Sequence, residues 1–247
     1  MVTNLQYFFE TAKKLRGGRW VWVKDSNGEN RNNILLGGTI ANPNKGFGHL
    51  WAAQLMQYTP GQPMLIFRSF KLKADAAANA TTIYIDGDGY SDAPEVGQYL
   101  MVAPDATEVV SMTADTSTGA VTVAKTTYTG TYAKVTGVTY DETNQKFEVT
   151  LENKLSTAKI DAGTILVEAD KSKDTESTGS APVLCPKPNV FNEADRDMLP
   201  TEGYGFQNAN YSVSGVYNKQ AWIAKMQPLP KYVLALNKSL IDGIFWI

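Results

Sequence analysis

Acidic residues at a spacing used by metal sites occur in one short stretch of the chain. In the run Asp86-Gly87-Asp88-Gly89-Tyr90-Ser91-Asp92, carboxylates stand at relative positions 1, 3 and 7. Carboxylates so spaced in a loop can converge on a hard cation such as calcium. The run lacks the glycine at position 6 and the glutamate at position 12 of an EF-hand loop, and Asp-Gly pairs are ordinary in turns between strands. Asp86, Asp88 and Asp92 are therefore the metal candidate, a tight turn is the competing interpretation, and we expect neither metal nor cofactor.

Side chains suited to nucleophilic catalysis are few. His49 is the only histidine, so no second histidine can complete a zinc or catalytic cluster. Ser214 precedes a glycine but lacks the first glycine of the G-x-S-x-G turn that exposes a nucleophilic serine. Cys185, the only cysteine, lies between Leu184 and Pro186 and is expected to pack as a small apolar side chain.

Glycine clusters and scattered acids complete the candidates for chemistry. The clusters at 37–38 and 46–48 match neither of the common phosphate-binding patterns, so loop geometry explains them. Two carboxylates roughly 5–9 Å apart would suit a glycosidase. The acids in question occur in turn-like contexts, where such side chains normally face solvent: Asp105, Glu108, Asp115, Asp141 and Glu142. We therefore predict no catalytic residue and a protein that is not an enzyme.

Overall composition narrows the range of partners. Hydrophobic residues make up 43% of the 247 residues, enough to build a core, and charged residues make up 19%. With a formal net charge of −2 and its basic residues spread along the chain, the protein lacks the field that would attract nucleic acid. No apolar run approaches the ~18–20 residues that span a bilayer, and the N-terminus does not resemble a secretory signal. We expect a protein made in a cytoplasm that binds neither nucleic acid nor membrane.

Short strand-like runs dominate the middle of the chain. Between about Lys73 and Ala169, runs such as 82–85, 99–102 and 120–123 are separated by turn-forming residues. This pattern predicts a fold that is mainly β with minor α, in which a β-sandwich or small-barrel module is flanked by mixed N- and C-terminal segments. Residues 50–58 are predicted to be helical, as are Tyr232 and the apolar residues that follow it.

A faint internal duplication occurs within this β-rich stretch. The sequence VGQYLMV at 96–102 resembles AGTILV at 162–167, and each follows another strand-like run. Two copies indicate a pair of related hairpins rather than a solenoid.

Both ends of the chain carry apolar residues that need a partner surface. Phe8 and Phe9 lie on the apolar face of a predicted short helix, which is marginal alone in water and must dock on the chain's own core or on a neighbouring subunit. An exposed Phe-Trp-Ile end would likewise invite association. We therefore expect an interface that includes Phe8, Phe9, Phe245, Trp246 and Ile247.

The composition changes divide the chain into four parts. Residues 1–72 form an N-terminal attachment and oligomerisation segment, and residues 73–169 form a projecting β-rich module. A polar stretch without periodicity marks a linker at 170–186. Residues 187–247 form a C-terminal segment that we expect to pack with the N-terminal one.

Several C-terminal sequences resemble virion proteins of tailed bacteriophages that infect Bacteroides-type bacteria. The runs are KPN at 187–189, ADRDMLPT at 194–201, MQPLPKYVL at 226–234 and GIFWI at 243–247. The similarity is greatest to head-fibre and capsid-decoration proteins, and the middle β-module adds to it. The resemblance implies a structural protein in the virion, made in the host bacterial cytoplasm. Its implied partners are copies of itself, as a trimer in fibres, and capsid or other virion proteins. It implies no cofactor and no catalytic residue.

Two other functions remain open from the sequence. A carbohydrate-binding surface module would stack host glycans on exposed aromatic side chains, although each of these could equally pack in a core. The candidates are Trp20, Trp22, Trp51, Tyr128 and Tyr132. The other possibility is a different part of the virion, such as the neck or tail.

Overall fold

Antiparallel strands make up most of the structure. The computed structural model describes residues 34–40, 49–105, 110–114, 117–118, 121–125, 129–173, 179–192, 196–197, 211–217 and 226–236. Within these ranges the chain forms four β-sheets, one 3-10 turn (η2, Lys171–Lys173) and one short α-helix (α2, Lys231–Leu236). The predicted fold class, mainly β with minor α, is confirmed. No helix in the described ranges is both long and apolar enough to cross a membrane.

The largest sheet has seven strands, all paired antiparallel. Six of them follow one path, and β13 is attached to the side of β10. In order along the path, the strands are β5 (Ser69–Lys71), β12 (Ile165–Glu168), β7 (Tyr99–Val102), β10 (Thr129–Asp141), β11 (Lys146–Leu151) and β6 (Thr82–Asp86), with β13 at Ser180–Pro182.

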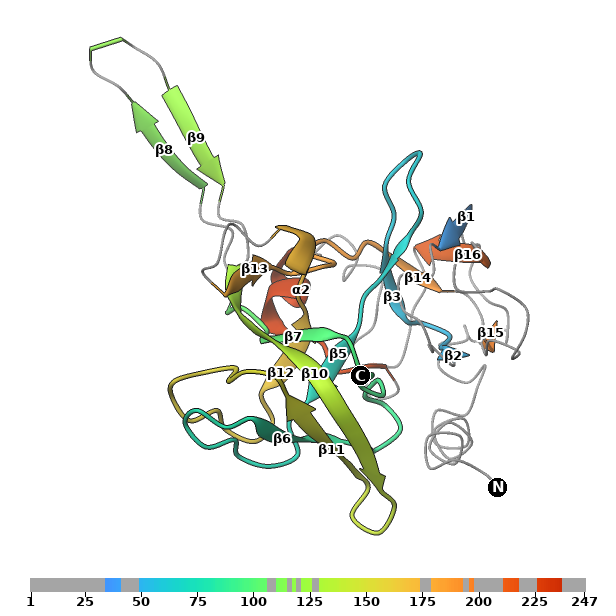
Figure 1. Cartoon of the computed structure of the whole chain (residues 1–247). Helices are drawn as coiled ribbons and strands as arrows, with labels where there is room; N and C mark the ends of the chain where they lie inside the picture. The colour runs from blue at the N-terminus through green and yellow to red at the C-terminus, as the bar shows by residue number, and fades with distance from the viewer. Residues whose placement is uncertain are drawn as a thin grey trace.

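The two ends of that path meet, so the six strands form a small barrel (Figure 1). Leu72, directly after β5, forms an antiparallel bridge with Ile85 of β6. Next to it, the Lys73 amide donates a hydrogen bond to the Tyr84 carbonyl over 2.8 Å. Closing a sheet in this way leaves none of these six strands as a long open edge.

Alternating apolar residues fill the barrel. Phe147, Val149 and Leu151 are buried along β11 while the residues between them are exposed, as expected for a strand with one face towards a core. Ile83 and Ile85 do the same on the neighbouring strand β6. Together with side chains from the other barrel strands they form one contiguous apolar cluster.

A five-stranded antiparallel sheet joins the first and last parts of the chain. β1 pairs with β16 along its full length, and β14 pairs with both β16 and β3. A separate two-strand ladder, β2 (His49–Leu50) with β15 (Arg196–Asp197), makes a similar long-range link. The strand order is β1 (Ile34–Ile40), β16 (Tyr211–Tyr217), β14 (Val190–Asn192), β3 (Leu55–Gln57) and β4 (Leu65–Ile66).

A second apolar cluster packs the five-stranded sheet and helix α2 against the outside of the barrel. Met101 and Val167 come from barrel strands, whereas Leu55 and Phe191 come from the five-stranded sheet. Tyr232 lies in α2, and its side chain is fully buried in the same cluster. The prediction of a helix at Tyr232 is confirmed for the described turn.

One hairpin stands apart from both layers. β8 (Val110–Ala114) and β9 (Val121–Lys125) pair through five registered positions, from Val110 opposite Lys125 to Ala114 opposite Val121. Neither strand pairs with any other strand of the described chain. Figure 1 shows the hairpin projecting well away from the barrel.

The predicted helix at residues 50–58 is wrong. The segment instead holds the end of β2, a turn, and β3. Ala53 adopts a left-handed backbone conformation with φ 62°, and its amide donates to the Asn192 carbonyl over 2.8 Å. Pairing with a strand more than a hundred residues away therefore outweighs the local helix-forming composition.

The expected linker at 170–186 is packed structure over much of its described length. Ala181, Val183 and Cys185 alternate with less buried neighbours and point into the apolar cluster outside the barrel. The polar residues before Ala181 dominate the composition of 170–186, and they obscure the alternation of apolar residues that follows them. Residues 174–178 of that stretch lie outside the described ranges. The module boundary expected at 73 also falls inside the barrel, since β5 precedes it.

The faint sequence duplication corresponds to two similar turn-and-strand units. Gly97 and Gly163 both have positive φ, 97° and 83°, and each comes shortly before a barrel strand. Those strands, β7 and β12, are antiparallel neighbours in the barrel. The units are therefore adjacent. The expectation of related hairpins is wrong, because β7 does not pair with the preceding β6 and β12 does not pair with the preceding β11.

Candidate functional site

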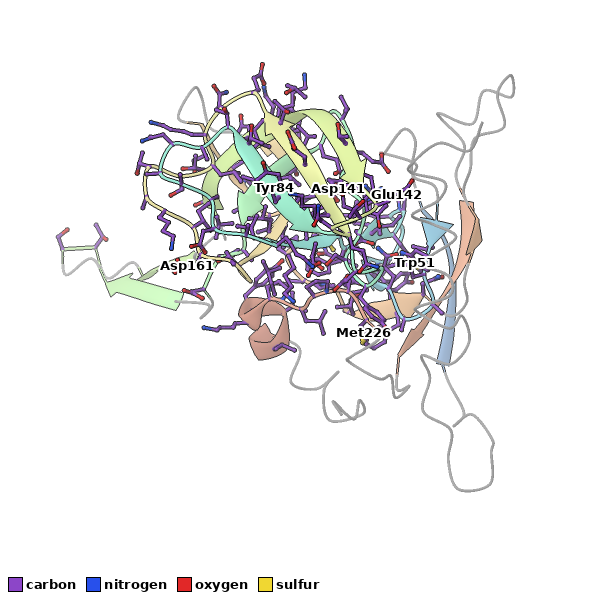
Figure 2. All side chains as sticks on the ribbon, turned by 90° about the horizontal axis from the view of Figure 1, so that it is seen from below. Trp51, Tyr84, Asp141, Glu142, Asp161 and Met226 are labelled. Atoms are coloured by element: carbon purple, nitrogen blue, oxygen red, sulfur yellow. The ribbon has the colours of Figure 1, made fainter. Side chains whose placement is uncertain are left out.

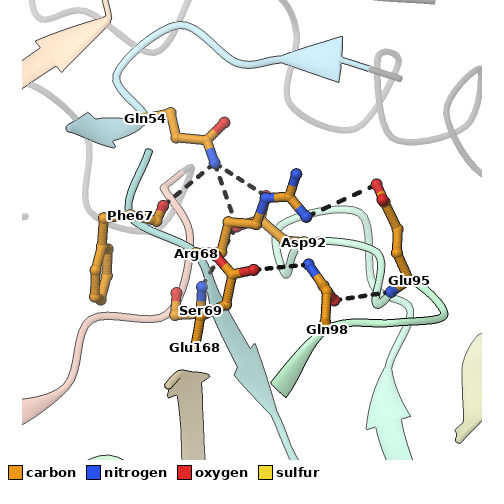
Figure 3. Close-up of polar contacts among 8 residues, drawn as sticks. All are labelled: Gln54, Phe67, Arg68, Ser69, Asp92, Glu95, Gln98 and Glu168. Carbon is orange, nitrogen blue, oxygen red and sulfur yellow. Dashed lines mark hydrogen bonds and ion pairs between the residues drawn. The ribbon is translucent and has the colours of Figure 1, made fainter. Parts of the chain in front are cut away.

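The most highly charged part of the interior lies where the barrel meets the five-stranded sheet. Seven side chains, here called the joint cluster, gather at this place (Figure 3). They come from the turn before β3, the link from β4 to β5, the start of β5, the link from β6 to β7, and strand β12. The members are Gln54, Arg68, Ser69, Asp92, Glu95, Gln98 and Glu168.

Arg68 is the only cation of the joint cluster, and only 1% of its surface is exposed. Its Nη1 lies 3.7 Å from Glu95 Oε1. Arg68 sits directly after Phe67, where the chain crosses from the five-stranded sheet into the barrel. The guanidinium is therefore held between the two layers.

Gln54 and Asp92 tie the two layers together. Gln54 Nε2 lies 3.3 Å from both carboxylate oxygens of Asp92 and 3.4 Å from the Phe67 carbonyl. Asp92 also accepts a hydrogen bond from the Ser69 amide over 3.4 Å. The Gln54 side chain extends from the loop before β3, so one amide group joins the five-stranded sheet to the barrel.

Gln98 connects the Glu168 carboxyl group to the backbone of Glu95. Its Nε2 donates to Glu168 Oε1 over 3.0 Å, and its Oε1 accepts from the Glu95 amide over 2.8 Å. Glu168 is 6% exposed. Its second oxygen has no hydrogen-bond partner among the described residues.

Burial dominates the electrostatics of the joint cluster. Desolvation raises the pKa of Glu95 to about 7, and the nearby carboxyl groups of Glu168 and Asp92 add to this, whereas Arg68 acts in the opposite direction. Desolvation also raises the pKa of Glu168, with Arg68 and the Gln98 hydrogen bond opposing it. Three carboxyl groups thus share one guanidinium away from water, which favours the neutral forms of Glu95 and Glu168.

The joint cluster is closed to a substrate. The side chain of Arg68 is 0% exposed and that of Glu95 only 11%. Two grooves of about 390 and 460 Å³ lie elsewhere, beside the ends of β7 and β12. The chemistry available to the cluster is therefore proton binding and hydrogen bonding between layers, and not turnover of a ligand.

The three carboxylates of the metal candidate have separate partners. Asp86 forms an ion pair with Lys73 at 2.9 Å and with Lys71 at 3.7 Å. Asp88 accepts hydrogen bonds from the backbone amides of Tyr90 and Ser91 at 2.9 and 3.0 Å, which is the behaviour of a turn residue. Asp92 belongs to the joint cluster. In the described part of the chain, no group of three or more His, Cys, Asp or Glu side chains could hold a metal.

Other residues singled out in the sequence occupy structural positions. Ser214 lies within β16 opposite Gly37 of β1, so neither belongs to a nucleophile turn or a phosphate loop. His49 pairs with Asp197 in the β2–β15 ladder. Cys185 is 3% exposed, as predicted for a packed thiol, and burial raises its pKa well above the usual value.

Acids considered as a catalytic pair are dispersed in the structure. Asp141 accepts hydrogen bonds from Asn144, which lower the pKa of its carboxyl, and it is the last residue of β10, directly before the turn to β11. Asp105 is almost fully exposed, with Lys231 at 4.0 Å. Figure 2 shows Asp141 and Glu142 together, far from Asp161. Glu108 and Asp115 lie outside the described residues.

The aromatic residues expected to stack on sugars do not form an exposed platform where they are described. Trp51 is 2% exposed and lies within the body of the molecule (Figure 2). Tyr132 is half-buried and packs edge-on against Tyr99, with ring centroids 5.6 Å apart. Trp20, Trp22 and Tyr128 are outside the described residues, as are the expected interface residues Phe8, Phe9, Phe245, Trp246 and Ile247.

Of the joint cluster, sequence reasoning singled out only Asp92, and it did so as a possible metal ligand. Its most informative members are single charges inside apolar runs, Arg68 after Ile66-Phe67 and Glu168 after Leu166-Val167. A charged residue at such a place is rarely left without a buried partner. This signal could have identified both residues as buried, although it could not have paired them.

Comparison with known proteins adds no relative. No family model matches the chain, and neither a curated protein nor a solved structure matches it.

Proposed function

We propose that this protein is a structural component of a bacteriophage virion, of the head-fibre or capsid-decoration type, that acts through protein–protein contacts. The resemblance of its C-terminal runs to such proteins supports the class of function. The observation that carries the contact-making role is the β8–β9 hairpin, which stands away from the barrel (Figure 1).

A hairpin of two strands is at best marginally stable alone in water. β8 and β9 each pair only with one another among the described strands, so the outer edge of each is open there. Open edges present backbone donors and acceptors that can pair with another chain. The hairpin is therefore suited to being completed by a partner.

The register of the hairpin adds a second reason. Val110, Met112 and Ala114 stand opposite Lys125, Val123 and Val121, so five apolar residues occur at these alternate register positions. The register positions between them hold Ser111, Thr113, Thr122 and Ala124. Apolar residues on a two-stranded arm add stability only when a partner covers them.

The partner we propose for the hairpin is a second copy of this chain. β1 is the outer strand of the five-stranded sheet, and its seven residues offer another open edge within the described chain. Figure 1 shows the hairpin and β1 on opposite sides of the molecule, so they can meet only between copies. A contact between two different surfaces closes into a ring, such as a trimer, when the rotation allows it.

Light scattering during size-exclusion chromatography tests this proposal. The full chain should elute as a closed multimer of its 27.0 kDa unit at two concentrations and two salt strengths. Replacing residues 106–128 with a short Gly-Ser turn should reduce the mass to that of a monomer. β7 and β10 are antiparallel neighbours, so the barrel can tolerate the shorter connection. The control variant Glu142→Ala alters an exposed turn between other strands and should keep the multimer.

Each outcome bears on a different part of the proposal. A full chain that stays monomeric at every concentration contradicts self-association. A multimer that survives removal of the hairpin contradicts its role in the contact. Labelling of purified virions with an antibody against this chain tests the virion location, and absence of the chain from virions would contradict it.

A carbohydrate-binding surface module is the second candidate. The observation in its favour is the groove of about 460 Å³ at one end of the barrel, whose lining includes Thr131, Ser156, Lys159 and Asp161. Hydroxyl and charged groups of this kind are the partners that sugar hydroxyls use. Glycan-array binding that disappears in Asp161→Ala would support the module, and no binding to any glycan would remove it.

A further inference from the structure

The joint cluster surrounds the place where the chain passes from one layer of the structure to the other. The chain passes from β4 to β5, and so from the five-stranded sheet to the barrel, at Phe67-Arg68. The Phe67 carbonyl accepts hydrogen bonds from Gln54 Nε2 at 3.4 Å and from Gln227 Nε2 at 2.9 Å. The Phe67 amide in turn donates to the Leu55 carbonyl over 2.9 Å. Loss of these hydrogen bonds at Phe67 would therefore weaken the contact between the barrel and the five-stranded sheet.

Charged groups approach Glu95 from each element packed against it. Arg68 comes from the crossing point, at 3.7 Å, and Glu168 comes from strand β12. Asp92 comes from the same connection as Glu95 itself. Gln98 supplies the neutral contact between the Glu95 backbone and Glu168.

The charge balance of the joint cluster depends on Glu95. Asp92 and Glu168 lie near Glu95 and oppose its ionisation, whereas Arg68 favours it. Ionisation of Glu95 therefore adds one more negative charge to a place where burial already disfavours charge. A buried charge that is incompletely compensated is costly, and separation of the layers would relieve the cost by admitting water.

We propose that the joint cluster makes the packing of the barrel against the five-stranded sheet sensitive to pH, tightening it in mild acid and loosening it in mild alkali. The device needs no ligand, and it operates whatever partner the chain binds. It differs from the ordinary acid lability of proteins, because here the acidic side of neutrality is the tighter state.

The stability should fall as the pH rises, because burial raises the pKa of Glu95. Its pKa is raised from 4.5 to about 7, so between these values the folded chain holds a proton that the unfolded chain releases. The resulting stabilisation is complete below about pH 4.5 and is lost as the pH rises through about 7. The stability therefore changes with pH mainly between about pH 4.5 and 7, and ionisation of Glu95 in the folded chain is centred near pH 7.

Unfolding by urea across this window tests the proposal in the wild-type protein. Net release of one proton on unfolding raises the unfolding constant by up to about tenfold per pH unit. Between pH 5 and 7 the wild type should approach that slope. In Glu95→Gln, which keeps a neutral polar side chain, the slope should be much smaller. The matched variant Glu152→Gln removes an exposed carboxyl group and should keep the wild-type slope.

Hydrogen exchange then distinguishes a loosened joint from a general loss of stability. After correction for the intrinsic effect of pH on exchange, peptides covering Phe67 and Ser69 should lose protection between pH 5.5 and 8 in the wild type. Peptides covering Val149, inside the barrel, should change less. In Glu95→Gln both sets should keep their protection.

Three results would overturn the proposal. The first is a wild-type unfolding constant that does not change between pH 5.5 and 7.5, which requires no variant and so does not depend on how Glu95→Gln folds. The second is a Glu95→Gln protein with the same pH dependence as the wild type. The third is equal loss of protection at Ser69 and Val149.

Discussion

Gln98 Nε2 lies 3.0 Å from Glu168 Oε1 and so connects two neighbouring strands of the barrel, because Gln98 precedes β7 and Glu168 ends β12. The same Gln98 side chain accepts the Glu95 amide at 2.8 Å. One neutral residue thus supplies a donor to one buried acid and an acceptor to the backbone of the other.

Replacing Gln98 with leucine should destabilise the fold by about 1–3 kcal/mol. Glu168 would stay buried without the donor that Gln98 provides, and the Glu95 amide would lose its acceptor. Urea unfolding measures the loss. The exposed Gln62 serves as the control, since Gln62→Ala should change stability by no more than about 0.5 kcal/mol. Equal effects of the two substitutions would contradict the importance of the contact.

Substitution of Arg68 with methionine should cost about 3–5 kcal/mol at pH 8, because the buried carboxyl groups then lose the one cation of the joint cluster. At pH 5 the loss should be smaller, since Glu95 is protonated there in both proteins. Urea unfolding at the two pH values provides the comparison. Lys71→Met removes a half-exposed partner of Asp86 and should cost less than about 1 kcal/mol. A penalty that is independent of pH would argue against coupling between Arg68 and Glu95.

Two glycines near the barrel make a matched pair for testing close packing. A Cβ at Gly87 would stand 2.7 Å from Tyr140 Cε2 and 3.0 Å from the backbone of Gln145. A Cβ at Gly130 would meet the end of the flexible Met101 side chain at 2.8 Å. Gly87→Ala should therefore lower stability by about 1–3 kcal/mol, and Gly130→Ala by clearly less. Thermal unfolding of both variants decides the order, and the reverse order would contradict the packing described around Tyr140.

Cys185 should react with a thiol reagent only after unfolding. The thiol is 3% exposed, and burial raises its pKa well above the usual value, so little thiolate is present or accessible at neutral pH. Reaction with a disulfide reagent at pH 8 should be at least about a hundred times slower in buffer than in concentrated urea. Fast modification of the folded chain would show that the strand leading from β13 opens readily.

Local patterning was sufficient to predict much of the barrel. The alternation of Phe147, Val149 and Leu151 and the apolar runs at 82–85 and 99–102 indicated strands, and they are strands. The same reasoning failed at 50–58, where Ala52, Ala53 and Gln54 favour a helix locally but the partner strand β14 lies far along the chain. A pattern confined to neighbours carries no information about such a partner.

The joint cluster was inaccessible to sequence reasoning for a related reason. Gln54, Arg68, Glu95 and Glu168 are separated by 14 to 73 residues between successive members, and only closure of the barrel brings them together. The Asp-Gly run illustrates the opposite case. Its carboxylates are close in sequence, yet Asp86 and Asp92 have separate partners.

The pairing of β1 with β16 also has a consequence for the order in which the protein folds. Every barrel strand lies between residues 69 and 168, whereas β1 must wait for residues 211–217 before it can form its ladder. Contacts between distant segments form late, and chains fold from the N-terminus as they emerge from the ribosome. The barrel can therefore fold during synthesis, while β1, β3 and β4 await their remaining partner strands. A nascent chain held on the ribosome once residue 168 has emerged from the exit tunnel should already contain a protease-resistant barrel, and completion of the second sheet should follow release of the C-terminal strands.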